Sequence, residues 1–137
     1  MIAYLDSSVV LRIILNQNDK SSDVESVKRA IASRLMKTEC LRTLDRFRII
    51  GTLNEDEYLT AVEDLYELLK TVEWIEISTL VLDRASTSFP VALGTLDSIH
   101  LVSALLWREK MLMEPVFFTH DKMLAKAALS QGLKILH

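Results

Sequence analysis

The sequence predicts an α/β protein built on a parallel sheet with helices on both of its faces. Short apolar runs alternate with helical segments of about 10–15 residues, the crossover length that parallel strands need. Half of the 137 residues are hydrophobic, so the chain can bury a sizeable core. Three Gly and two Pro leave room only for short loops, and no repeat or linker divides the chain. We therefore expect one domain over residues 1–137.

The expected strands are short runs rich in apolar, β-branched or aromatic residues, and the expected helices carry apolar residues at helical spacing. Strands are predicted at 2–5, 33–36, 73–78, 115–120 and 134–137. Helices are predicted at 7–15, 21–33, 37–50, 54–72, 80–88, 96–110 and 121–132.

Local signals place the boundaries in the N-terminal half. Asp6 marks the turn after the first strand. Ser22 stands three residues before Glu25, as in a capping box, and the amphipathic pattern that follows predicts the helix over 21–33. The next helix is expected to end at Gly51.

Similar signals operate in the C-terminal half. Acidic residues fill the first turn of the helix predicted over 54–72, where their negative charge interacts favourably with the positive end of the helix dipole. The segment 73–78 has the alternation and residue types of a strand. Pro90 is expected to stop the helix before it, and Gly132 to end the last helix.

Composition narrows the function classes. With 16 Lys and Arg against 19 Asp and Glu, the formal net charge is −3. This balance does not indicate a nucleic-acid binder, but it allows one that holds phosphates through metal ions or a local basic patch. Cys40 is the only cysteine, so no internal disulfide can form. Asp6 and Arg12 interrupt the N-terminal apolar run, and no basic leader precedes it, so we expect no membrane segment and a cytoplasmic protein.

Four acidic residues have positions that suggest a shared site. Asp6 directly follows the first predicted strand, and Asp121 follows the strand over 115–120. In an open parallel sheet, ligand sites form beyond the carboxyl ends of the strands where the strand order reverses. Asp97 and Glu39 each lie in the first turn of a predicted helix and could face the same crevice.

A purely structural alternative exists for each of these acids. Asp6, Asp97 and Asp121 occupy plausible cap or first-turn positions, where Asp is favoured over Ala by about 0.5–2 kcal/mol. Thr95 or Asp97 could cap the helix over 96–110, and Glu39 could be an ordinary surface residue.

Convergence of the acids would have a chemical consequence. Like charges about 4 Å apart repel by about 4 kcal/mol at an effective dielectric near 20, so a cluster needs a cation or shared protons. Oxygen-only ligands suit Mg²⁺ or Mn²⁺. Such an ion can activate water for an in-line displacement at phosphorus.

Four segments carry a family resemblance. They are YLDSS at 4–8, TE at 38–39, LGTLDSIHLVSAL at 93–105 and FFTHDKMLAKAA at 117–128. In this order and spacing the chain resembles PIN-domain proteins, most closely the single-domain VapC-type toxins of toxin–antitoxin pairs. The resemblance implies a three-layer α/β/α sandwich and an Mg²⁺- or Mn²⁺-dependent endoribonuclease. It also implies a homodimer and a cognate antitoxin that binds across the active-site groove.

The resemblance also implies roles for individual residues. Asp6 and Asp97 match the principal metal ligands, and Asp121 would complete the cluster or act through water. Glu39 would help to hold the metal or orient the attacking water. The hydroxyls of Ser7 and Thr119 match positions that support these ligands. Residues 16–36 match the family least, which leaves substrate contacts and antitoxin specificity open.

Further residues have expected roles of their own. His100 is expected to pack or hydrogen-bond within the core, and Cys40 to behave as a small buried hydrophobe. Two basic pairs share helix faces beside the acids and could bind RNA phosphates: Arg42 with Arg46, and Lys122 with Lys126.

The alternative to a nuclease is a non-catalytic interaction module of the same fold. Its apolar surface would bind a partner helix, and its stability would not respond to magnesium.

Overall fold

A computed structural model describes residues 1–15 and 22–137. The described strands are β1 (Ile2–Leu5), β2 (Arg29–Ser33), β3 (Val72–Ile75), β4 (Val116–Phe118) and β5 (Lys134–Leu136). The described helices are α1 (Ser7–Ile14), α2 (Ser22–Glu25), α3 (Leu35–Ile49), α4 (Glu55–Leu69), α5 (Thr79–Ala85), α6 (Thr95–Met111) and α7 (Lys122–Ser130). The five strands form one parallel sheet in the order β3-β2-β1-β4-β5.

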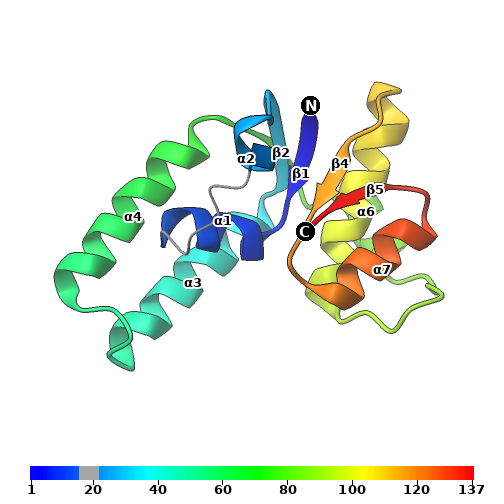
Figure 1. Ribbon diagram of the computed structural model, residues 1–137. Helices are drawn as coiled ribbons and strands as arrows, with labels where there is room; N and C mark the ends of the chain where they lie inside the picture. The colour runs from blue at the N-terminus through cyan, green and yellow to red at the C-terminus, as the bar shows by residue number, and fades with distance from the viewer. Residues whose placement is uncertain (16–21) are drawn as a thin grey trace.

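Successive side chains of the central strands point to opposite faces and build two cores. Ala3 and Leu5 of β1 pack into a core with α1, α3 and α4, whereas Tyr4 packs with α6 and α7. Figure 1 shows α1, α3 and α4 on one side of the sheet and α6 and α7 on the other. Helix α5 packs on α6 through Val81 and Ile99. The prediction of a three-layer α/β/α sandwich is therefore confirmed.

The strand order reverses between β1 and β4. From β1 the chain adds β2 and then β3 on one side, and it later returns to place β4 and β5 on the other side. Leu5 pairs with Phe118 at the carboxyl ends of the two strands, and the Asp6 N–H donates to the Phe118 carbonyl at 3.3 Å. The segments that follow β1 and β4 thus begin side by side, at the position where open α/β sheets bind ligands (Figure 1).

The helix predicted over 21–33 is confirmed only over α2 (Ser22–Glu25), and the strand predicted over 33–36 is wrong. Residues 29–33 form β2, which pairs with both β1 and β3, and α3 already begins at Leu35. The short apolar run in this strand fits a helix face as well as a strand that is buried on both sides, and only sheet pairing distinguishes them. Ser21 lies outside the described residues, as does the side chain of Ser22, so the predicted capping box is not described.

The remaining elements lie where the sequence predicts them, with ends that differ by a few residues. Val72 begins β3 instead of ending α4, and α5 ends at Ala85, earlier than expected. Gly51 and Gly132 follow the ends of α3 and α7 with φ of 83° and 80°, as expected for glycine after a helix. None of the helices within residues 1–15 and 22–137 is long and apolar enough to cross a membrane.

Candidate active site

Asp6 is buried at the carboxyl edge of the sheet and accepts three hydrogen bonds. As the N-cap of α1 it accepts from the Val9 N–H at 3.3 Å. The Ser8 hydroxyl donates to the same carboxylate oxygen at 2.5 Å, and the Thr119 hydroxyl donates to the other oxygen at 2.5 Å. Only 4% of Asp6 is exposed, so these donors take the place of water around its oxygens.

Thr119 links the ends of the two neighbouring strands. Its hydroxyl donates to Asp6, and its oxygen accepts from the Asp121 N–H at 3.0 Å. Asp121 in turn caps α7 by accepting from the Leu124 N–H at 2.8 Å. The capping interpretation therefore holds for Asp6 and Asp121, and both residues are also tied into the same edge of the sheet.

Asp97 does not cap its helix. The N-cap of α6 is Gly94, which has no side chain, so the expectation that Thr95 or Asp97 caps this helix is wrong. Burial raises the pKa of Asp97, and the nearby charges of Asp121, Asp6 and Glu39 raise this pKa further, while His100 lowers it. The raised pKa of Asp97 thus reflects its own burial and the proximity of the other three acids to it.

Glu39 is held by a buried histidine. Because α3 begins at Leu35, Glu39 lies in the second turn of its helix and not in the first. One of its carboxylate oxygens forms a direct hydrogen bond with His100 Nε2. The other ring nitrogen of His100 lies 2.7 Å from the Tyr4 hydroxyl. The expectation that His100 hydrogen-bonds within the core is confirmed, but sequence reasoning missed both of its partners.

The serine that contacts Asp6 is Ser8, although the family resemblance pointed to Ser7. The Ser8 hydroxyl donates to Asp6 and accepts from the His120 N–H at 3.0 Å, so it joins the two edge segments as Thr119 does. A hydroxyl two residues after an Asp can form such a local hydrogen bond, and this signal was present in the sequence.

The Cys40 thiol is buried and resists ionisation. Burial and the nearby charges of Glu39 and Asp6 raise the pKa of the Cys40 thiol to about 12. The thiol therefore stays protonated at neutral pH, and it points to the Ser7 carbonyl at 3.9 Å. Its expected role as a small buried hydrophobe is confirmed.

The donor atoms of the four acids suit a hard divalent cation. Within the described ranges, no group of three or more His, Cys, Asp or Glu side chains is placed so that it could hold a metal ion. The available donors are carboxylate oxygens, which Mg²⁺ and Mn²⁺ prefer. A cation would also relieve the unfavourable charge at Asp97. The carboxylates therefore fit such an ion in the chemistry of their donor atoms and in charge.

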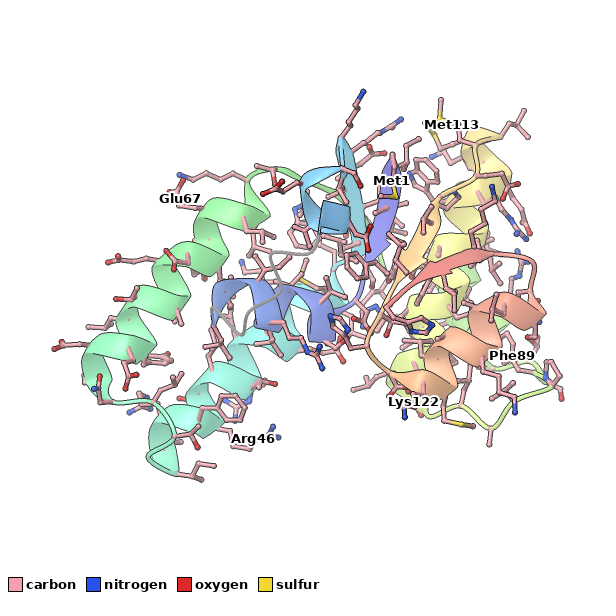
Figure 2. The ribbon with its side chains drawn as sticks, viewed as in Figure 1. Met1, Arg46, Glu67, Phe89, Met113 and Lys122 are labelled. Carbon is pink, nitrogen blue, oxygen red and sulfur yellow. The ribbon has the colours of Figure 1, made fainter. Side chains whose placement is uncertain are left out.

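The side chains of the two basic pairs differ in their interaction partners. Arg42 donates to Asp45 at 3.1 Å, and the Arg46 guanidinium lies over the Phe47 ring at 5.7 Å. Lys122 and Lys126 form no salt bridge within the described part of the chain. Lys122 lies at the start of α7, at the end of the molecule opposite Met1 and Met113 (Figure 2). Within the described residues, the lysines of α7 thus have no salt-bridge partner, whereas Arg42 of α3 has one.

Comparison with known proteins supports the fold. No protein-family model matches the chain, and no curated protein matches it. Among solved structures, the chain is similar to PAE2754 from Pyrobaculum aerophilum, with 20% sequence identity and a TM-score of 0.62. The match covers 98% of this chain and 83% of that chain. At this identity the likeness shows the fold alone.

Proposed function

We propose that this chain is a metal-dependent endoribonuclease that hydrolyses RNA phosphodiester bonds. The observation that carries the proposal is the environment of Asp97. Its pKa is raised by burial and by three further acids, at the point where the strand order reverses. Asp97 lies in the first turn of α6 without capping it, so its carboxylate oxygens are not used by the helix backbone and are available to a cation. The resemblance to VapC-type toxins supports the same chemistry.

The proposed roles follow from how each acid is held. Asp6 and Asp97 would be the principal ligands of Mg²⁺ or Mn²⁺, with Asp121 beside them and Glu39 as a further ligand or as the group that orients water. When bound, the ion supplies a Lewis acid and lowers the pKa of water. The hydroxyls of Ser8 and Thr119 keep the Asp6 carboxylate in one orientation.

The proposal extends to partners. We propose that the chain acts as a cytoplasmic toxin and forms a homodimer. A cognate antitoxin would inhibit it by binding across the four acids, Asp6, Glu39, Asp97 and Asp121. RNA phosphates on either side of the scissile bond would bind Lys122 and Lys126, whose ammonium groups have no ion-pair partner among the described residues.

Removal of single carboxylates tests the activity. Asp6→Asn and Asp97→Asn should each reduce metal-dependent cleavage of single-stranded RNA by about 100-fold or more, because each removes a charge that the transition state needs. Glu63→Gln, which changes an exposed acid of α4, is the matched control and should cleave as the unaltered protein does. Cleavage that survives in both site variants, or in excess chelator, would contradict the nuclease proposal.

The non-catalytic interaction module remains the second candidate, because no chelate is preformed in the described residues. Thermal unfolding at increasing Mg²⁺ separates the two functions. A metal site should raise the free energy of unfolding by about 2.7 kcal/mol once the ion reaches 100 times its Kd. A protein whose melting temperature is insensitive to millimolar Mg²⁺ would favour the interaction module.

A further inference from the structure

A chain of buried hydrogen bonds leads from the sheet to Glu39. The Ser33 N–H donates to the Tyr4 hydroxyl oxygen at 3.3 Å, the Tyr4 hydroxyl lies 2.7 Å from His100 Nδ1, and His100 Nε2 contacts Glu39 directly. Tyr4 is fully buried and His100 is 1% exposed, while the Glu39 side chain retains 19% exposure. This series of hydrogen bonds therefore runs from the core outward and ends on the Glu39 carboxylate, which is partly exposed to solvent.

The partners constrain these hydrogen bonds. The Tyr4 oxygen accepts from the Ser33 N–H, and the Tyr4 hydroxyl lies 2.7 Å from His100 Nδ1. A carboxylate can only accept, so His100 Nε2 carries the proton of its hydrogen bond with Glu39. Contacts at both ring nitrogens hold the imidazole in one orientation between Tyr4 and Glu39.

The hydrogen bonds from Tyr4 to Glu39 join the two helical layers close to the four acids. Glu39 comes from α3 in one layer, His100 comes from α6 in the other, and Tyr4 lies on β1 between them. His100 is also one turn after Asp97 on α6, so the same residue lies beside two of the four acids. His100 takes one oxygen of Glu39 and leaves the second oxygen without a hydrogen-bond partner among residues 1–15 and 22–137.

We propose that Tyr4 and His100 are positioning residues that direct the free oxygen of Glu39 toward the cation and its water. The inference rests on the proposed nuclease function and assigns it two residues that do not touch the reacting atoms. Partners that orient a ligand in this way typically change metal affinity or activity by about 10–100-fold when they are removed.

Tyr4→Phe is the first test. It removes the hydroxyl but keeps the ring, which is stacked on Phe117 with centroids 4.9 Å apart. We expect Mn²⁺ titrated alone to bind this variant about tenfold more weakly than the unaltered protein. Tyr58→Phe, which removes a hydroxyl from α4, is the matched control and should bind Mn²⁺ normally. Equal affinity of Tyr4→Phe and the unaltered protein would overturn the positioning role.

A double-mutant cycle separates positioning from a general loss of packing. If Tyr4 acts through Glu39, Tyr4→Phe should have no further effect on Mn²⁺ affinity in a Glu39→Gln background. A tenfold loss that persists in that background would overturn the proposal.

Two substitutions of His100 provide an independent test. His100→Gln keeps an N–H that can reach Glu39 and should retain Mn²⁺ affinity better than His100→Leu, which offers only apolar volume. The opposite order, or no difference between the two folded variants, would contradict the proposal. Nitrogen NMR of the unaltered protein without metal should show the proton of His100 on Nε2, and a proton on Nδ1 alone would overturn the assigned direction.

These experiments distinguish the two levels of the proposal. Unaltered protein that binds no Mn²⁺ and cleaves no RNA overturns the nuclease function, and the positioning role with it. Unaltered protein that binds and cleaves, while Tyr4→Phe matches it in both, overturns the positioning role alone.

Discussion

At the scale of single residues, two aspartates of the candidate site have opposite environments. Asp6 is 4% exposed, yet two hydroxyls and one backbone N–H donate to its carboxylate. Asp97 is less buried, does not cap its helix, and its pKa is raised by burial and by neighbouring acids. Protein donors thus occupy the oxygens of Asp6, whereas burial and neighbouring acids disfavour the charge of Asp97.

The raised pKa of Asp97 predicts a gain in stability on neutralisation. In metal-free buffer at pH 7, Asp97→Asn should raise the free energy of unfolding by up to about 1 kcal/mol, because it removes a charge that the folded state disfavours. Urea unfolding measures this gain. Asp83→Asn, at an exposed position of α5, should show no such gain.

The pH dependence of this gain has a definite sign. A carboxyl group whose pKa is higher in the folded state binds its proton more tightly there, so the unaltered protein becomes relatively more stable as the pH falls through that pKa. The advantage of Asp97→Asn should therefore shrink in acid. An advantage that stays constant down to pH 3 would mean that the charge of Asp97 is not its cause.

At the scale of elements, α6 carries Asp97 and His100 near its start and has an unusual end. Leu112 follows the helix in the left-handed region, with φ of 54°, and its N–H donates to the Arg108 carbonyl. Glycine holds the corresponding left-handed position after α3 and α7, at Gly51 and Gly132. A side chain in this conformation costs about 1–2 kcal/mol, and Leu112 is 89% exposed, so it recovers little of that cost by packing.

Leu112→Gly should accordingly stabilise the protein. We expect a gain of about 0.5 kcal/mol in the free energy of unfolding, because the relief of strain exceeds the entropy that glycine adds to the unfolded chain. Leu129→Gly is a control of opposite sign, since Leu129 is an exposed residue inside α7 and glycine there should cost about 1 kcal/mol. Chemical denaturation of both variants tests the prediction, and a loss at position 112 would contradict it.

At the scale of the whole molecule, the two ends of the sheet carry different groups of polar residues. Asp6 and Asp121 follow the carboxyl ends of β1 and β4, while Glu73 joins the amino-terminal parts of β2 and β3 to α6. Glu73 accepts from Arg29 at 2.8 Å and from the Trp107 indole at 3.1 Å, and the Arg29 guanidinium lies 5.3 Å from the centre of the Trp107 ring. This cluster holds the edge strand to the helix that carries Asp97.

Glu73→Gln should reduce stability without reducing RNA cleavage. Hydrogen bonds from Arg29 and Trp107 lower the pKa of Glu73, so its contribution is present above the ordinary pKa and is lost as the pH falls through the lowered one. The side chain is 40% exposed, and solvent screening limits the loss at pH 7 to about 1 kcal/mol. Thermal unfolding at pH 7 and in acid should show a difference that vanishes in acid. A large loss of cleavage in the folded variant would show that the two ends are coupled.

Local sequence was enough to establish the α/β class, four of the five strands and the edge positions of Asp6 and Asp121. Strand composition, helix periodicity and capping are properties of a few neighbouring residues, so they can be read without the fold. First-turn positions also suggested Glu39 and Asp97 as members of a shared site. The resemblance to PIN-domain proteins added Ser7 and Thr119 and the metal chemistry, which remains a prediction.

Tertiary structure alone decided β2, the contact of Ser8 with Asp6 and the link from Tyr4 through His100 to Glu39. The apolar run of β2 becomes a strand because β1 and β3 pair with it. His100 lies 96 residues from Tyr4 and 61 from Glu39 along the chain. Contacts at such separations depend on how two helical layers pack on one sheet, and no local pattern of residues encodes that packing.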